Sequence, residues 1–157
     1  MSLKKVKVKR EYKIIIDTRE QLPLSFRKGV IKRKLDFGDY ACEYDDGETA
    51  HICFERKSPE DLAQTITRGH DRFKRELLRA CDAGVFLKVI VECSYDDFIA
   101  GNYNNRVHSK MRPDVVAKIL HKMMVRYTLD VVFTGSRSGS TSFIRNTFNA
   151  LNEEYYV

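Results

Sequence analysis

The sequence contains no tryptophan, only three prolines and no long apolar run. A helix that spans a bilayer needs about 20 consecutive, mostly apolar residues, and no stretch of the chain approaches that length. The N-terminus carries the positive charges of a secretory signal peptide without the apolar core of such a peptide. We therefore predict no membrane partner and no secretion, and we expect an intracellular protein, in the cytoplasm of a prokaryote or virus-infected cell or in a nucleus.

The sequence also lacks the cysteine and histidine spacings of a zinc site. Its four cysteines include no C-x-x-C pair and its four histidines are scattered, whereas structural zinc sites need closely spaced ligands of these types. We interpret the cysteines as small, buried, apolar residues in a reducing compartment. They are Cys42, Cys53, Cys81 and Cys93.

Acidic residues are absent from the first ten positions, which hold five of the 28 lysines and arginines. Nearly all of the net charge of +6 therefore lies at the N-terminus. We predict a flexible basic arm over residues 1–11, followed by a single domain over residues 12–157, because a chain of this length supports one core. The arm is interpreted either as a solubilising tail or as a non-specific phosphate-binding segment.

Apolar runs and helical repeats predict an α/β domain with a mixed central sheet flanked by helices. An initial meander of strands is followed by strands that alternate with helices. The expected strands cover residues 12–16, 30–35, 37–44, 50–57, 85–93 and 129–134. The expected helices cover residues 58–81, a short part of 96–112, a segment that begins at residues 112–114, and residues 141–155, with a loop at 135–139.

The helix predicted over residues 58–81 has two distinct faces. It begins with a serine cap at Ser58 and a proline at the first helical position. Four apolar residues recur at helical spacing and predict the core face, namely Leu62, Ile66, Phe73 and Leu77. Four arginines predict the opposite face, namely Arg68, Arg72, Arg75 and Arg79. We interpret these arginines either as a solvated surface or as contacts to DNA phosphates.

Three residues near the middle of the chain suggest a metal site. Side chains alternate along a strand, so Glu55 and Lys57 share one face of the strand while Arg56 lies on the other. If the segment that contains Asp39 pairs with this strand, two carboxylates and one ammonium group converge. Carboxylates suit Mg²⁺ or Mn²⁺, and such an ion can assist phosphodiester cleavage. An ordinary hairpin with solvent-facing charges is the alternative on spacing alone.

We predict a site in which Asp39, Glu55 and Lys57 are catalytic. The two acids and the backbone carbonyl of Arg56 are the predicted ligands of Mg²⁺ or Mn²⁺, and the lysine orients the attacking water or stabilises the transition state. Further candidates follow the first strand. Asp17 and Glu20 could each supply another carboxylate, and Arg19 could clamp a phosphate.

These motifs together resemble the nuclease domain of the XPF/Mus81 structure-specific endonucleases, the ERCC4 domain. The matching segments are Asp17-x-Arg19-Glu20, Gly38-Asp39-Tyr40 and Glu55-Arg56-Lys57-Ser58. The similarity covers about residues 12–155. It implies a restriction-endonuclease-like fold, dependence on a divalent metal and incision of branched or flapped DNA. On the family's pattern, the catalytic residues are Asp39, Glu55 and Lys57, with contributions from Asp17, Arg19 and Glu20.

The sequence departs from the family at two points. This chain has Glu76 where members often have glutamine, and it contains no tandem helix-hairpin-helix module. We therefore expect a fragment, a protein whose partner supplies DNA binding, or a minimal stand-alone nuclease.

We predict a metal-dependent, structure-specific DNA endonuclease, and two alternatives stay open. The first is a non-catalytic DNA-binding or partner subunit of a nuclease complex, and the second is a related resolvase or restriction-type nuclease. The resembled family dimerises through this domain. We accordingly expect a homodimer or heterodimer formed by the C-terminal helices, unless their apolar residues simply complete the core. These residues are Met123, Met124, Phe143, Tyr155 and Tyr156.

Overall fold

The computed structural model describes residues 10–27, 29–103 and 111–153 of the chain. The described strands are β1 (Tyr12–Ile16), β2 (Val30–Lys32), β3 (Tyr40–Tyr44), β4 (Ile52–Lys57), β5 (Phe86–Val91) and β6 (Asp130–Phe133). The described helices are α1 (Pro59–Ile66), α2 (His70–Asp82), α3 (Tyr95–Ala100), α4 (Pro113–Tyr127) and α5 (Arg137–Glu153). No helix within these residues is long and apolar enough to cross a membrane.

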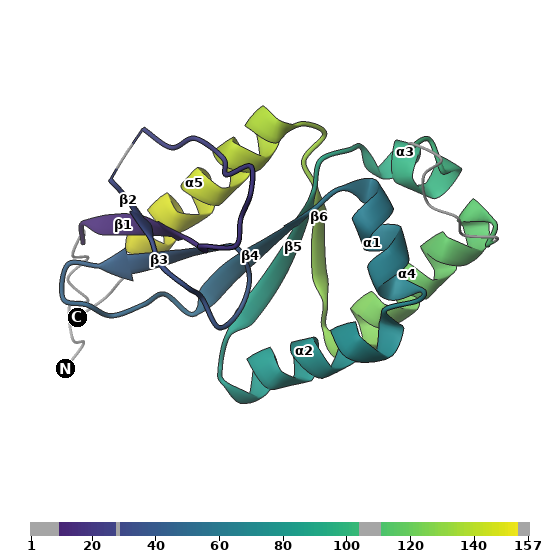
Figure 1. Ribbon diagram of the computed structural model, residues 1–157, viewed down its shortest axis with the longest axis horizontal. Coiled ribbons are helices and arrows are strands. Elements are labelled where there is room, and N and C mark those ends of the chain that lie inside the picture. The colour runs from purple at the N-terminus through teal and green to yellow at the C-terminus, as the bar shows by residue number, and fades with distance from the viewer. Residues whose placement is uncertain (1–9, 28, 104–110, 154–157) are drawn as a thin grey trace, which may run out of the picture.

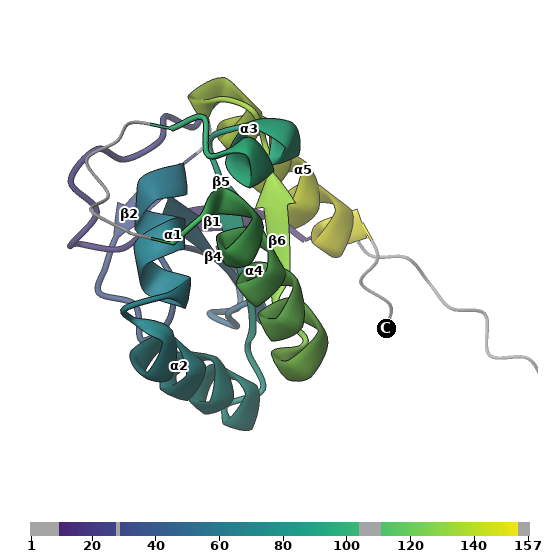
Figure 2. The same cartoon turned by 90° about the vertical axis from the view of Figure 1, so that its right-hand side faces the viewer.

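The described strands form one mixed sheet in the order β2-β1-β3-β4-β5-β6. Strand β3 runs antiparallel to both β1 and β4, whereas the pairs β1–β2, β4–β5 and β5–β6 are parallel. The sheet is covered on both faces (Figures 1 and 2), with α5 on one face and α1, α2, α3 and α4 on the other. This arrangement confirms the predicted α/β class and the mixed central sheet.

Each face of the sheet has its own apolar core, as the alternation of side chains along the strands requires. On the α5 face, Phe54 of β4 packs edge-on against Phe143 and Phe148 of α5. On the opposite face, the four apolar residues predicted for the first helix are all buried with Val89 of β5. Because side chains alternate, only every second residue of β4 lies on this second face of the sheet.

The helix predicted over residues 58–81 is two helices, so that prediction is wrong in its continuity. Helix α1 ends at Ile66 and α2 begins at His70. The Thr67 hydroxyl donates a hydrogen bond to the Ala63 carbonyl at 2.6 Å. A side chain on Gly69 would bring its Cβ within 3.0 Å of the Thr65 carbonyl oxygen, so glycine permits this tight connection.

Strand ends and one loop also differ from the sequence expectation. Strand β2 ends at Lys32 and β3 begins only at Tyr40, because the intervening segment bends at Gly38, whose φ is 70°. Helix α5 begins at Arg137, inside the segment predicted as a loop. The Ser136 hydroxyl accepts a hydrogen bond from the Gly139 amide at 3.0 Å and caps this first turn.

Two smaller predictions have mixed outcomes. All four cysteines are free thiols, but Cys81 is exposed, so its predicted burial is wrong.

Of the predicted basic arm, residues 1–9 lie outside the described part of the chain. Arg10 packs on the domain, with its guanidinium carbon 3.5 Å from the centre of the Tyr44 ring. The boundary of the arm at residue 11 stays a prediction.

Candidate active site

Asp39 is fixed beside β4 by the glycine that precedes it. The amide of Asp39 donates a hydrogen bond to the Phe54 carbonyl at 2.7 Å. A side chain on Gly38 would place its Cβ 2.7 Å from the same carbonyl oxygen, and its φ of 70° favours glycine. The turn therefore brings Asp39 next to Glu55, the residue that follows Phe54 in β4.

The side chains of β4 alternate as the sequence predicted. Lys57 Nζ lies 2.9 Å from Glu55 Oε1, and each side chain is 15% exposed. The second oxygen, Glu55 Oε2, is buried and has no hydrogen-bond partner among the described residues. Arg56 lies on the opposite face, where its Nε is 2.8 Å from Glu92 Oε1.

Asp39 is poorly stabilised as a negative charge. Its Oδ2 accepts one hydrogen bond, from the Arg56 amide at 2.8 Å. Burial raises the pKa of this carboxyl to about 6, and the neighbouring carboxylates of Glu55 and Glu20 act in the same direction. The hydrogen bond and the nearby Lys57 ammonium oppose the rise without cancelling it. A cation at this point would remove the repulsion between the carboxylates.

The Asp39–Glu55 pair fits a hard divalent cation. Each carboxylate keeps one oxygen that accepts no hydrogen bond from the described residues, and Glu55 Oε2 is buried. Mg²⁺ is commonly held by one or two carboxylates and keeps several waters. Within residues 10–27, 29–103 and 111–153, no group of three or more histidine, cysteine, aspartate or glutamate residues is placed to hold a metal ion. Further ligands would therefore be backbone oxygens or water.

Asp17 lies in a closed network of hydrogen bonds, although the sequence also suggested it as a metal ligand. The side chain is 1% exposed. Arg19 donates to it from the amide and from Nε, both at 2.8 Å, and from Nη2 at 3.1 Å, while the Leu35 amide donates at 2.6 Å. These bonds, above all those from the Arg19 side chain, lower the pKa of Asp17 to about 2. Both of its oxygens are engaged by donors of the protein.

Glu20, the other candidate ligand, contacts the back of β4. Its Oε2 lies 3.5 Å from Arg56 Nη1 and accepts a hydrogen bond from the Tyr40 hydroxyl at 3.2 Å. The Arg56 guanidinium also donates to the Leu22 carbonyl at 2.5 Å. Arg56 thus holds the loop after β1 with its side chain and Asp39 with its amide.

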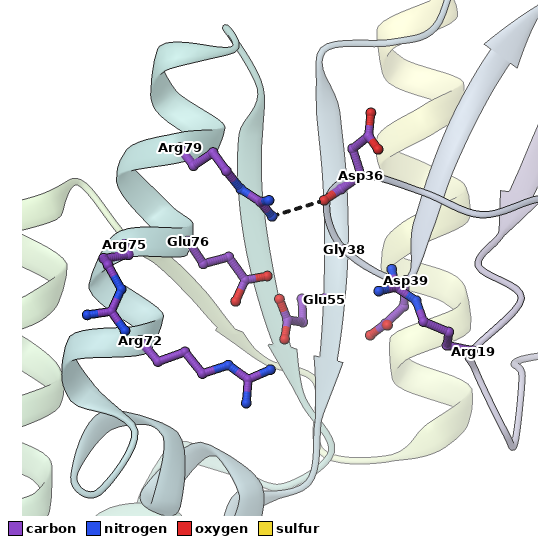
Figure 3. A pocket seen from close by; sticks show the side chains of 9 residues that line it. All are labelled: Arg19, Asp36, Gly38, Asp39, Glu55, Arg72, Arg75, Glu76 and Arg79. Carbon is purple, nitrogen blue, oxygen red and sulfur yellow. Dashed lines mark hydrogen bonds between the residues drawn. The ribbon is translucent and has the colours of Figure 1, made fainter.

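An open hollow of about 460 Å³ lies between the sheet and α2 (Figure 3). The sheet side contributes Arg19, Asp36, Gly38, Asp39 and Glu55, and α2 contributes Arg72, Arg75, Glu76 and Arg79. An adjoining hollow is lined by Lys57, Arg68 and Arg72 among others. The structure therefore brings all five arginines that were predicted to bind DNA to the surroundings of Asp39 and Glu55.

Glu76 is a site residue that the sequence prediction did not include. It lines both hollows together with Glu55 and Arg72. Burial raises the pKa of its carboxyl, and the Glu55 carboxylate raises it further. A sequence signal for this placement exists, because Glu76 follows Arg72 by four residues and therefore shares its helix face.

Comparisons with known proteins identify the family and the fold of this chain. The model of the ERCC4 domain family matches residues 16–147. The structure of XPF from Aeropyrum pernix is similar over 90% of this chain, with a TM-score of 0.62 and 18% identity. XPF from Aeropyrum pernix in complex with DNA is similar over 87% of it, with a TM-score of 0.60 and 19% identity. The chain spans 66% and 62% of those two chains. No curated protein matches it.

Proposed function

The chain belongs to the ERCC4 domain family, and from this premise we propose that it is a metal-dependent endonuclease that cuts branched or flapped DNA. One observation carries the proposal above the others. Asp39 and Glu55 line a hollow whose opposite wall carries arginines, and each acid keeps one carboxylate oxygen that accepts no hydrogen bond from the described residues. A hydrolytic site for a phosphodiester needs both features, a place for a cation and positive groups for the phosphates.

The metal site of the proposal consists of Asp39, Glu55 and the backbone carbonyl of Arg56. Mg²⁺ or Mn²⁺ bound there would supply a polarised water and neutralise charge on the phosphate. The protein's own contribution is the placement of its groups. Glu55 holds the Lys57 ammonium at 2.9 Å, and the same ammonium lies 5.9 Å from the centre of the Phe73 ring. Lys57 is therefore fixed where it can orient a water or meet developing negative charge.

We assign Asp17 and Glu20 to positioning rather than to metal binding. Asp17 fixes the Arg19 guanidinium in a bidentate contact, and the Leu35 carbonyl accepts a further bond from Arg19 at 3.0 Å. The guanidinium stays at the rim of the hollow, where it can contact a phosphate. Glu20 contributes a single, longer contact to Arg56 at the back of β4, with 3.5 Å between Oε2 and Nη1.

Arginines on both sides of the hollow are the proposed contacts to DNA. Arg19 stands on the sheet side and Arg68, Arg72, Arg75 and Arg79 stand on or beside α2. Phosphate contacts of this kind position a nucleic acid without reading its sequence. The similar XPF structure in complex with DNA supports DNA as the ligand. A preference for branches or flaps is proposed from the family resemblance.

The test is cleavage of a radiolabelled flap and a matched linear duplex in Mg²⁺ or Mn²⁺. The expected result is metal-dependent cleavage of the flap that is lost in Asp39→Ala and in Glu55→Ala. Asp36→Ala is the matched control, because Asp36 lines the same hollow on an exposed segment. Activity that survives both substitutions would overturn the site. DNA binding without cleavage under all metal conditions would support a non-catalytic subunit instead.

We also propose that a second copy, or a related chain, docks on α5 and the edge strand β6. A hollow there is lined by apolar side chains that include Val132, Phe133 and Ala150. Phe143 also lines this hollow, whereas Met123 is buried in the core. Tyr155 and Tyr156, also predicted for this surface, lie outside the described residues. Sedimentation should show a dimer that Ala150→Arg disrupts, and a monomer at high concentration would overturn the idea.

A further inference from the structure

Glu76 points from α2 across the hollow toward Glu55 (Figure 3). Its carboxylate is half-buried and lines both hollows of the site. Three arginines, Arg72, Arg75 and Arg79, lie on the same helix within one or two turns. Among the described residues, however, none of them forms an ion pair or hydrogen bond with Glu76.

This placement is unfavourable for the protein alone. A carboxylate that loses water without gaining a partner loses solvation free energy, and a second carboxylate on the facing wall adds repulsion. The positive charges of Lys57, Arg79 and Arg72 offset part of this cost from a distance. Such a cost is typical of a residue whose partner arrives with the ligand.

We propose that Glu76 positions the water shell of the metal ion at Asp39 and Glu55 by accepting a hydrogen bond from a metal-bound water. This inference rests on the proposed function, since it requires a cation at the Asp39–Glu55 pair. Glu76 acts through water, because no three acidic side chains among the described residues are close enough to share one ion. Partners of this kind commonly strengthen metal binding about tenfold or more.

The position of Glu76 favours this role over a contact to DNA. Phosphates are negatively charged, so a carboxylate in their path weakens binding unless a cation lies between them. Glu55 Oε2 is buried and accepts no hydrogen bond from the described residues, and Glu55 lines the same hollow as Glu76. Among the described residues of α2, Glu76 is the acid that lines this hollow, so it would be the acceptor on that wall for a water of a cation held by Asp39 and Glu55.

The test is Mn²⁺ binding by calorimetry in the absence of DNA, with Glu76→Gln as the main variant. Glutamine keeps the shape of the side chain and removes the charge. The expected result is about tenfold weaker binding of Mn²⁺, together with a lower kcat and an unchanged or lower KM for a flap substrate. Asp82→Asn is the control, because Asp82 ends the same helix on its exposed surface and lines neither hollow.

Each other outcome has a defined meaning. Unchanged Mn²⁺ affinity in Glu76→Gln, with affinity lost in Asp39→Ala, would overturn the role of Glu76 and leave the metal site intact. Unchanged affinity in both variants, or no Mn²⁺ binding by the unaltered protein, would overturn the metal site as well. A higher kcat and tighter DNA binding in Glu76→Gln would show a merely repulsive charge. Glu76→Asp, which keeps the charge and shortens the reach, should bind Mn²⁺ with intermediate affinity.

Discussion

Asp17 and Asp39 are neighbours with opposite electrostatic environments. The amide of Asp17 donates a hydrogen bond to the carbonyl of Asp39 at 2.8 Å, so the two residues adjoin across β1 and β3. Asp17 receives donors at both oxygens, and its pKa falls to about 2. The Asp39 carboxylate accepts one hydrogen bond from the described residues, donated by the Arg56 backbone amide, and its pKa rises to about 6.

Both carboxylates are largely removed from water. The difference between their pKa values therefore comes from the number of hydrogen-bond donors that each carboxylate receives. A buried carboxylate with a full set of donors stabilises the fold as an ion. A buried carboxylate with few donors destabilises the fold until a proton or a cation joins it. Motif position alone does not separate these cases, because both acids belong to the segments that resemble the family.

The largest expected effect is on cleavage. Asp39→Asn should reduce the rate of cleavage by about 10³-fold or more, because the proposed metal loses a ligand. Asp17→Asn should keep the rate within about tenfold for the folded fraction, since Asp17 acts only through Arg19. Single-turnover cleavage of a flap at saturating protein measures both. Equal losses in two folded variants would remove the distinction between the acids.

The next effect is on stability at neutral pH. Asp17→Asn should lower the free energy of unfolding by about 2 kcal/mol, because the amide leaves the buried Leu35 amide poorly satisfied, whereas the exposed Arg19 guanidinium can turn to water. Urea unfolding at pH 7 measures the change. The exposed Asp45 supplies a control in Asp45→Asn, which should change the value by less than about 0.5 kcal/mol. A loss as small as that in Asp17→Asn would contradict the structural role of Asp17.

The two acids should also respond to pH in opposite directions in metal-free protein with chelator. The folded pKa of Asp39 is raised, so its contribution is fully present below about pH 4 and is lost as pH rises through about 6. Asp39→Asn should therefore exceed the unaltered protein in stability by about 2 kcal/mol at pH 7.5 and match it near pH 4. A difference that does not depend on pH would contradict the raised pKa.

Asp17 should show the opposite pH dependence of stability in the same experiment. Its folded pKa is lowered to about 2, so its contribution is present above about pH 4 and is lost as pH falls toward 2. The stability gap between the unaltered protein and Asp17→Asn should close over that acidic window. A gap that persists at pH 2 would show that the hydrogen bonds of Asp17 do not depend on its ionisation.

The smallest expected effect is on the salt dependence of DNA binding, and it compares two arginines instead of two acids. Arg56 has protein acceptors, whereas Arg75 lines the hollow without a protein acceptor among the described residues. Arg75→Ala should lower the slope of log affinity for DNA against log salt by about 0.9, the value for one phosphate contact. Lys118→Ala on the exposed part of α4 is the control and should leave the slope unchanged. An equal change in both variants would indicate non-specific charge effects.

Much of the fold could be predicted from periodicity. The strands, the long helices and the face of each side chain in β4 follow from alternation and helical spacing. The break at Gly69 was missed because the apolar repeat continues through it, and the close approach to Thr65 depends on tertiary packing. The early start of α5 was missed because glycines and serines usually indicate a loop, whereas here Ser136 caps a helix.

The acids and arginines of the site could be identified from motifs, but their states could not. Which carboxylate receives donors depends on backbone amides that come from distant segments, such as Leu35 for Asp17 and Arg56 for Asp39. Glu76 needed one further step, the recognition that the arginine face of the helix turns toward β4. That orientation is fixed by Phe73 and Leu77, which bury the other face of α2.

The hydrogen bond from the Asp39 amide to the Phe54 carbonyl has a consequence for how related sequences can vary. The hairpin tip between β3 and β4, around Gly47, is exposed, so insertions or deletions there need move neither carboxylate. One residue inserted between Glu55 and Lys57 would instead turn one of them to the far face of the sheet. Related sequences should therefore vary freely in the number of residues that separate the two acids, and not at all within the Glu55–Lys57 triplet.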